Sequence, residues 1–270
     1  MALPGRHRLM VTVLCAAIAG TKAIGSGIAG NGRATAARRT EAQVRAGGGR
    51  GQRLAGLPHV GELVVVEGLD GSGKRTLTAA LSLALAARGA SVTSRAFPRY
   101  GASVEAELLA EALHGRAGDL GTSVHGMAAL FALDRGGARA DLVAALATHD
   151  VVLLDRYTAS NAAFGAARLH EGAGGEFVAW VRELEFGRLG LPVPAVQLLL
   201  RVPVALAQHR AAGRESADPE RTRDAFELDH GLQERTGTVY DALAAAAWVS
   251  PWRVLEGTVD ADALAGHLLG

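Results

Sequence analysis

Five short apolar runs recur along the chain, and long stretches with apolar residues at helical spacing separate them. The first run is rich in β-branched residues, which is typical of a strand buried on both faces of a sheet. Strands that alternate with helices predict an α/β fold built on a parallel sheet. Ligands bind such a sheet beyond the carboxyl ends of its strands, so we expect functional residues directly after the runs. The runs cover residues 64–67, 91–96, 151–155, 196–202 and 252–255.

The segment after the first run has the form of a phosphate-binding loop. Gly68 is followed by four residues and then by Gly73 and Lys74, which opens a helical pattern over residues 74–88. Glycines at such positions let backbone N–H groups face phosphate oxygens, and the lysine adds a mobile positive charge. In a chain with 35 glycines, a glycine-rich turn that merely precedes a lysine is the alternative. The chain has 26 arginines but two lysines, and a lysine retained here favours the phosphate site.

Charge and composition divide the chain into two unlike segments. Residues 1–58 carry nine basic side chains and one acidic side chain, while the remainder has a net charge of −7. The first segment is rich in Gly, Ala and Arg without a sustained period, so we expect a disordered extension. Its opening resembles a signal peptide, but the apolar run is too short to span a bilayer. Residues 59–270 suffice for one α/β domain without cysteine chemistry, because the single cysteine is Cys15.

Four further motifs lie where such a sheet would place a site: FPRYG at 97–101, FALDR at 131–135, DRYTASNAAF at 155–164 and HRAAGRESADPERTRDAFE at 209–227. Together with the loop they resemble, in order and spacing, the thymidylate kinases, above all the actinobacterial ones, over residues 62–256. The resemblance implies a P-loop nucleoside monophosphate kinase fold, with a five-stranded parallel sheet, helices on both faces and a short lid at about 210–223. It also implies phosphorylation of dTMP to dTDP with ATP and Mg²⁺, for dTTP synthesis.

Phe131 and Arg135 are four residues apart on one predicted helix, so they share a face. An aromatic ring can stack on a pyrimidine, and a guanidinium can donate to a carbonyl oxygen of the base. The resemblance implies that Phe131 stacks on thymine and that Arg135 bonds its O4, with Asn161 at the thymine edge. From the residues alone, the alternatives are that Phe131 belongs to the core, that Arg135 is a surface charge and that Asn161 only starts a helix.

The third apolar run ends abruptly in the charged pair Asp155 and Arg156. A carboxylate at a strand end beside a phosphate loop is where Mg²⁺ or its water is usually held. Arg156 and Arg99 are expected to clamp the acceptor phosphate through charge-assisted hydrogen bonds, and Tyr100 to line the same pocket. A salt bridge without a catalytic role is the alternative for Asp155 and Arg156.

Arg75 stands where phosphate loops usually carry a serine or threonine hydroxyl that helps to hold Mg²⁺. Thr76 should not replace that hydroxyl, because one residue along a helix turns a side chain by roughly 100°. The metal must then find carboxylates elsewhere, and the motifs place Asp70, Asp155 and Glu227 for this role. The resemblance favours Asp70 and Glu227. Arg75 would then be a second cation on the ATP phosphates or, alternatively, a solvent-facing helix residue.

The arginine-rich segment after the fourth run should form a lid that closes over ATP. Some thymidylate kinases place a catalytic arginine in the phosphate loop, whereas this chain has Leu69, Gly71 and Ser72 there. The resemblance therefore assigns the catalytic arginine to the lid, with Arg214 as the first choice and Arg221 as the second.

Phe164 and Phe226 stand at positions where a tyrosine is usual in the family. Both keep a ring and lose a hydroxyl near the expected position of the deoxyribose. The grip on the sugar, and with it the exclusion of ribose, should therefore be looser than in relatives.

The expected site combines loop, strand-end and lid residues. Catalytic roles fall to Lys74, Asp70, Arg99, Asp155, Arg156, Arg214 and Arg221. ATP should contact Gly68, Leu69, Asp70, Gly71, Ser72, Gly73, Lys74, Arg75 and Thr76. The substrate dTMP should contact Asp70, Phe97, Arg99, Tyr100, Phe131, Arg135, Arg156, Asn161, Phe164, Asp224 and Phe226.

The resemblance implies a cytoplasmic homodimer that binds dTMP and ATP, without a nucleic-acid or membrane partner. A deoxynucleoside kinase would share the loop and the sheet, but its third strand usually runs into Glu-Arg-Ser, whereas this one runs into Asp-Arg-Tyr. A non-catalytic nucleotide-binding module would not need Lys74, Asp155 and the arginine lid together.

Overall fold

The computed structural model describes residues 60–217 and 224–270, and of residues 214–217 it describes the backbone. The expected disordered extension over residues 1–58, part of the lid and Arg221 lie outside the described residues. What was expected of them remains a prediction.

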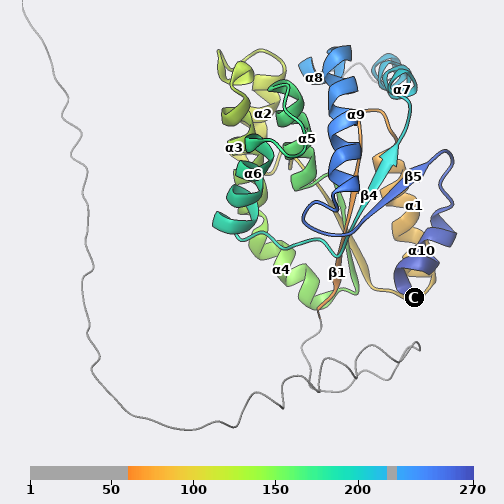
Figure 1. Ribbon diagram of the computed structural model, residues 1–270. Coiled ribbons are helices and arrows are strands. Elements are labelled where there is room, and N and C mark those ends of the chain that lie inside the picture. The colour runs from red at the N-terminus through yellow and green to blue at the C-terminus, as the bar shows by residue number, and fades with distance from the viewer. Residues whose placement is uncertain (1–59, 218–223) are drawn as a thin grey trace, which may run out of the picture. The chain divides into compact units, whose positions relative to one another are not determined.

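Five parallel strands form one sheet in the order β2-β3-β1-β4-β5 (Figure 1). The strands are β1 (Glu62–Glu67), β2 (Val92–Ala96), β3 (Val151–Asp155), β4 (Val196–Arg201) and β5 (Trp252–Glu256). Each strand coincides with one of the predicted apolar runs, with ends that differ by at most two residues. The predicted α/β fold with a parallel sheet is therefore confirmed.

Helices connect the strands and cover both faces of the sheet (Figure 1). Their bounds are α1 (Lys74–Ala87), α2 (Val104–Leu113), η1 (Leu120–Thr122), α3 (Val124–Gly137), α4 (Arg139–Thr148), α5 (Thr158–Arg168), α6 (Glu176–Arg182), η2 (Glu183–Arg188), α7 (Val204–Ala217), α8 (Ala225–Leu228), α9 (His230–Ala245) and α10 (Ala261–Leu269). Within the described ranges, no helix combines the length and the apolar character needed to cross a membrane.

The apolar core lies on both sides of β1. Val64 and Val66 pack with residues of α1 and α10 on one face. On the opposite face Leu63 and Val65 pack with residues of α4, and Leu199 of β4 packs with residues of α5, α6 and α9. Because successive side chains of a strand alternate between the faces, a strand covered on both sides has a continuous apolar run. This burial explains why the apolar pattern of the first run predicted a strand buried on both faces of the sheet.

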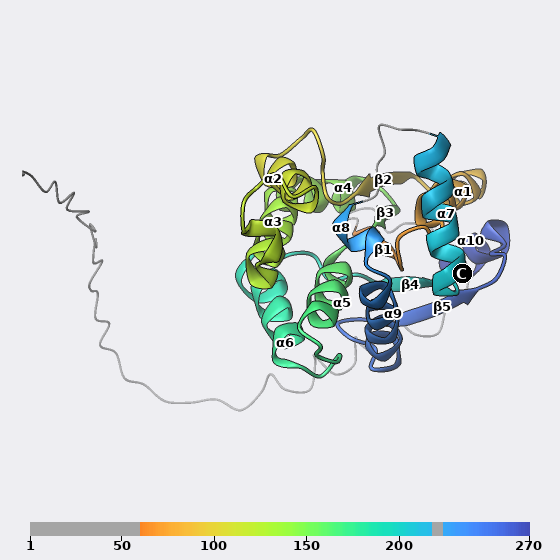
Figure 2. The same cartoon turned by 90° about the horizontal axis from the view of Figure 1, so that it is seen from above.

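The carboxyl ends of the central strands meet at one edge of the sheet. In the register of the sheet, Val66 of β1 pairs with Asp155 of β3, and Glu67 pairs with Leu199 of β4. Seen from above, α8 lies over this edge, with α2 and α3 on one side and α7 on the other (Figure 2). The fold thus brings the phosphate loop, the end of β3 and α8 together.

Candidate active site

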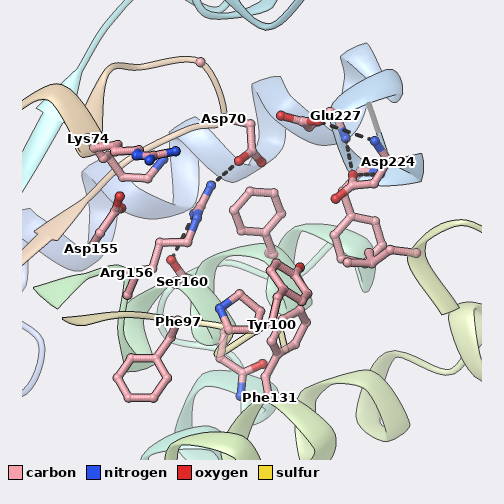
Figure 3. A pocket seen from close by; sticks show the side chains of 18 of the residues that line it. Asp70, Lys74, Phe97, Tyr100, Phe131, Asp155, Arg156, Ser160, Asp224 and Glu227 are labelled. Atoms are coloured by element: carbon pink, nitrogen blue, oxygen red, sulfur yellow. Dashed lines mark hydrogen bonds and ion pairs between the residues drawn. The ribbon is translucent and has the colours of Figure 1, made fainter. Parts of the chain in front are cut away.

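A cavity of about 1390 Å³ opens at the carboxyl ends of the strands. Its lining comes from the phosphate loop and α1, from the ends of β2 and β3, and from helices α2, α3, α5, α7 and α8. Asp70 and Arg156 face each other on one side of it, and Tyr100 and Phe131 lie on the other (Figure 3). The five sequence motifs therefore contribute to one site.

The loop between β1 and α1 has the backbone shape that phosphate binding requires. Gly68 and Gly71 adopt φ angles of 145° and 78°. A Cβ atom at Gly71 would lie 1.9 Å from the carbonyl oxygen of Ala207, and one at Gly68 would lie 2.7 Å from that of Leu200. Both positions need glycine for space as well as for conformation. The loop leads into the amino-terminal turn of α1, where backbone N–H groups attract anions.

Lys74 lies inside this loop and is only 7% exposed. Its Nζ donates to the backbone carbonyl oxygen of Leu69, 2.7 Å away. Burial, together with the charge of Arg156, lowers the pKa of Lys74 to about 8, against the opposing effect of Asp70 and Asp155. A phosphate group bound beside the ammonium would raise that pKa, because its negative charge favours the protonated form.

Arg156, directly after β3, pairs with Asp70 of the loop (Figure 3). Its Nη1 donates to Oγ of Ser160 at 3.1 Å and to the carbonyl oxygen of Gly68 at 3.3 Å. Burial raises the pKa of Asp70, but the charges of Arg156 and Lys74 outweigh burial and hold that pKa below its usual value. The guanidinium is thereby fixed at the cavity wall beside the phosphate loop.

Glu67 supports this arrangement and was missed by the sequence analysis. It is fully buried at the end of β1, and its carboxylate accepts from Oγ of Ser160 at 2.6 Å, from Oη of Tyr240 at 2.9 Å and from the backbone N of Tyr157 at 2.8 Å. These bonds join β1 to α5 and α9 behind Arg156. The signal was a carboxylate that ends a buried apolar run, since a buried charge needs such partners.

Arg135, Asn161 and Glu185 form a second buried group at the cavity. Arg135 is 2% exposed, and its Nε and Nη2 donate to Glu185 at 2.5 and 2.6 Å. Nδ2 of Asn161 donates to Glu185 at 2.8 Å and to the carbonyl oxygen of Ala128 at 3.0 Å. Arg135 is therefore no surface charge. Phe131 is partly buried and lines the cavity with Arg135 and Asn161.

Arg99, which was expected to clamp the acceptor phosphate, is bound to Asp134, and its role at the phosphate stays a prediction. Its Nε and backbone N donate to the carboxylate of Asp134 at 2.8 and 3.0 Å, and its Nη2 donates to the backbone carbonyl of Asp134 at 2.7 Å. Ser103 donates to the same carboxylate at 2.6 Å. Among the described residues that line the cavity, Phe97 and Tyr100 are present and Arg99 is not. The buried Asp134 holds the guanidinium against α3.

Helix α8 brings Asp224, Phe226 and Glu227 to the cavity. The carboxylate of Asp224 caps this helix by accepting from the backbone N of Phe226 at 2.8 Å and of Glu227 at 2.9 Å. Burial and the nearby charge of Asp70 raise the pKa of Asp224 to about 6. The rings of Phe226 and Phe164 stack with centroids 6.0 Å apart. The two positions that lack the usual hydroxyl are thus neighbours.

Arg168 is a second cavity residue that the sequence analysis missed. Its guanidinium lies over the ring of Phe226, 4.8 Å from the centroid, and its Nη2 donates to the carbonyl oxygen of Gly121 at 2.7 Å. A cation is attracted electrostatically to the face of an aromatic ring. Arg168 therefore helps to hold α8 at the cavity. No local motif around Arg168 signals this contact.

The structure leaves the metal ligands as a prediction. In the part of the chain that it describes, no three His, Cys, Asp or Glu side chains form a group that could hold a metal ion. Asp70 is paired with Arg156, Asp155 lies beside Lys74, and Glu227 lies on α8 (Figure 3).

Arg75 and Thr76 occupy the first turn of α1, and both are exposed and line the cavity. Both positions thus border the cavity, and the expectation that Thr76 does not replace the missing hydroxyl stays a prediction. The exposure of Arg75 agrees both with a second cation on the ATP phosphates and with a solvent-facing helix residue.

The lid arginines are only partly described. Arg210 lines the cavity, and its Nη1 donates to the carbonyl oxygen of Ser72 at 3.4 Å. Arg214 belongs to the part of α7 for which the backbone alone is described, and Arg221 lies outside the described residues. The choice of the catalytic arginine remains a prediction.

A family model for thymidylate kinase matches residues 66–249, which run from the end of β1 past α9. The chain belongs to the thymidylate kinase family. It is 54% identical over 206 residues to the thymidylate kinase of Mycobacterium tuberculosis (strain CDC 1551 / Oshkosh), covering 76% of this chain and 96% of that protein. It is 33% identical over 206 residues to the thymidylate kinase of Xanthomonas euvesicatoria pv. vesicatoria (strain 85-10), covering 76% and 80%.

Among solved structures, a thymidylate kinase from Candida albicans matches with a TM-score of 0.56 and 21% sequence identity, covering 78% of this chain and 90% of that one. At this identity the likeness shows the fold alone, and it confirms the P-loop nucleoside monophosphate kinase fold. The mycobacterial match agrees with the actinobacterial resemblance. Membership of the thymidylate kinase family supports kinase activity over both alternatives, the deoxynucleoside kinase and the non-catalytic module.

Proposed function

We propose that the chain transfers the terminal phosphoryl group of ATP to dTMP, with thymine held by Phe131, Arg135 and Asn161. The observation that carries this proposal is the direction of the Asn161 amide. Its Nδ2 donates to the carbonyl oxygen of Ala128 and to Glu185, at 3.0 and 2.8 Å. Both partners can only accept, so the amide nitrogen points into the protein. In the described part of the chain no group donates to Oδ1 of Asn161, which leaves an acceptor for a ligand in the cavity.

The base end therefore offers an acceptor from Asn161 and N–H donors from Arg135. Thymine carries the complementary pair, a donor at N3 and a carbonyl acceptor at position 4. Cytosine carries the reverse, an acceptor at N3 and an amino group at position 4, and would leave both protein groups unpaired. Unpaired buried polar groups are costly, so the site should discriminate strongly between the two bases.

At the phosphate end, the chain supplies positive charge and fixed geometry. Lys74 and Arg156 lie near each other at the phosphate loop, and Arg156 pairs with Asp70 (Figure 3). Phosphoryl transfer needs little covalent chemistry from a protein, so in-line positioning and neutralisation of charge provide most of the catalysis. Arg214 or Arg221 would add a further cation when the lid closes.

The carboxylates of Asp70, Asp155 and Glu227 would hold Mg²⁺. Mg²⁺ in kinases is usually bound by one or two carboxylates together with waters and phosphate oxygens, so oxygen donors at a phosphate loop suit it without a three-ligand protein cluster. When bound, Mg²⁺ neutralises negative charge on the transferring phosphates.

We further propose a homodimer that works in the cytoplasm. Val104 and Leu108 of α2 and Leu133 of α3 are large apolar side chains that are exposed in the single chain. Such helical surfaces suit an interface with a second copy. Sedimentation at micromolar concentration tests this part of the proposal, and a monomer would contradict it.

One panel of assays tests the activity. ADP release is measured with ATP and, in turn, dTMP, dUMP, dCMP, dAMP, dGMP and thymidine. We expect dTMP to be preferred over dCMP by at least about a hundredfold in kcat/KM, from the cost of unmade buried hydrogen bonds. Preferential turnover of thymidine would favour a deoxynucleoside kinase. ATP binding without turnover of any substrate would favour a non-catalytic module.

A further inference from the structure

One carboxylate connects the two side chains assigned to the base. Glu185 is 0% exposed, and its Oε2 accepts from Nε of Arg135 at 2.5 Å. Its Oε1 accepts both from Nη2 of Arg135 at 2.6 Å and from Nδ2 of Asn161 at 2.8 Å. Glu185 belongs to η2, so a third element orients side chains that come from α3 and α5.

The local backbone explains how this glutamate reaches the site. Segment η2 is a π-helix, in which the backbone N of Leu189 donates to the carbonyl oxygen of Leu184, five residues earlier, at 3.0 Å. The wide turn leaves Glu183 with 66% of its side chain exposed, while Glu185 is buried. The backbone N of Leu191 donates to the carbonyl oxygen of Glu185 at 3.0 Å and fixes this residue from the other side. Such π-helical turns are rare and occur frequently at functional sites.

The contacts of Glu185 fix the polarity of the site as well as its shape. An asparagine amide can turn over and exchange its donor for its acceptor with almost no change in volume. Glu185 and the carbonyl of Ala128 prevent this, because both accept from Nδ2 of Asn161. The two parallel bonds to Arg135 likewise fix the plane of the guanidinium and so the direction of its other N–H groups.

We infer that Glu185 is a positioning residue that sets the base selectivity of this kinase, an inference that rests on the function proposed above. Glu185 acts through its partners: it keeps Oδ1 of Asn161 available to N3–H of thymine, and it aims Arg135 at O4. Without the carboxylate, Asn161 can present its amino group instead. The cavity then no longer penalises the N3 acceptor of cytosine.

A purely structural role for Glu185 makes a different prediction. Burial lowers the pKa of Arg135, but Glu185, together with the nearby Tyr157 and Glu67, raises it overall, so the guanidinium stays charged inside the protein. If Glu185 did no more than neutralise this charge, its loss would destabilise the fold and impair every nucleotide substrate alike. A change in the ratio between substrates distinguishes the two roles.

The test is Glu185→Gln, which keeps the size and removes one acceptor. A glutamine has one acceptor oxygen, whereas the donors of Arg135 and Asn161 face both carboxylate oxygens of Glu185. Either the Asn161 amide turns over or the Arg135 fork is displaced. We expect kcat/KM to fall by at least about tenfold for dTMP and in parallel for dUMP, which has the same N3–H and O4, with no fall for dCMP.

Glu183→Gln is the matched control, because it makes the same chemical change two residues away on an exposed side chain. It should leave the dTMP to dCMP ratio unchanged. Glu185→Asp retains the charge but retracts the carboxylate, so it should lower the same ratio by less than Glu185→Gln does. If Glu185→Gln does not fold, as judged by its melting temperature, the aspartate variant alone provides the test.

A double-mutant comparison shows whether Glu185 acts through Asn161. In an Asn161→Ala background, Glu185→Gln should cause a much smaller further change in the dTMP to dCMP ratio. Equal losses on dTMP, dUMP and dCMP, or a fully additive effect in that background, would overturn the inference. Failure of the wild-type chain to prefer dTMP would instead overturn the proposed function, so the two failures can be told apart.

Discussion

Nζ of Lys74 donates to the backbone carbonyl oxygen of Leu69 across the interior of the phosphate loop, 2.7 Å away. The ammonium is held where the terminal phosphates of ATP would lie, so binding requires little reorganisation of the loop. Preorganised donors of this kind account for much of the catalysis in phosphoryl transfer.

Lys74→Ala should remove about 3 kcal/mol of transition-state stabilisation, in line with the loss of one preorganised donor. Binding of dTMP should survive, because Arg135 and Asn161, which are proposed to hold thymine, are bound to Glu185 and make no hydrogen bond to Lys74. Steady-state kinetics give the first quantity and calorimetry of dTMP binding gives the second. Turnover close to that of the wild type would contradict the role assigned to Lys74.

The same lysine should make the protein less stable than it would be with an uncharged side chain. Its pKa is about 8 in the folded protein and 10.5 as the ordinary value, so the fold disfavours the charged form. The destabilisation of the fold by the charged Lys74 is fully present below about pH 8 and disappears as pH rises toward 10.5. Lys74→Met should therefore raise the free energy of unfolding near neutral pH, on the order of 1–3 kcal/mol, with a smaller gain at higher pH.

Urea unfolding of the wild type and of Lys74→Met at a series of pH values between about 7 and 9.5 measures this difference. Arg75→Met is the control, since it removes an exposed cation from the next position. It should show no gain that fades with pH. A Lys74→Met variant without any gain near neutral pH would refute the argument.

Arg156 and Arg99 provide a second comparison, because both were expected to bind the acceptor phosphate. Arg156 faces the loop through Asp70, whereas Arg99 is bound to Asp134. Arg156→Met should lower kcat/KM by about a hundredfold or more, the usual cost of removing one partner of a buried charge pair. Arg99→Met should lower it by less than about tenfold, acting mainly through stability. Equal kinetic losses with unchanged melting temperatures would show that Arg99 acts at the phosphate site, as the sequence predicted.

The strands and the phosphate loop could be predicted because their causes are local in the sequence. β1 and β3 are buried on both faces, which requires the continuous apolar runs that the sequence contains. Gly68 and Gly71 lie where any Cβ atom would collide with the backbone, so their spacing reveals the loop. The roles of Phe131, Arg135 and Asn161 came from the family resemblance, since the residues alone favoured a core Phe131 and a surface Arg135 and left Asn161 open.

The contacts of the supporting side chains could not be predicted, because their partners are distant in sequence. Glu185 lies among alternating charges, a pattern typical of a solvated helix face, and only the π-helical turn carries it inside. Glu67 meets Tyr240 from the far end of the chain, and Arg99 turns to Asp134 on α3. No periodicity in the sequence encodes these three contacts.

The last prediction concerns the metal and Arg75, which stands where a hydroxyl ligand is usual. Arg75 is exposed at the cavity and cannot contribute an oxygen, so the carboxylates of Asp70, Asp155 and Glu227 are left as ligands. Glu227→Gln is nearly isosteric but uncharged, and it should raise the Mg²⁺ concentration needed for half-maximal activity by several-fold, on the order expected for one lost charged ligand. Glu234→Gln, on an exposed position of α9, is the control and should leave that concentration unchanged.

Arg75→Thr should lower activity, because it removes a cation from the ATP phosphates without moving the carboxylates. Activity is measured against Mg²⁺ concentration for all three variants. An unchanged Mg²⁺ requirement in Glu227→Gln, together with faster turnover in Arg75→Thr, would contradict this account, because a hydroxyl at position 75 would then serve the metal better than the carboxylate of Glu227.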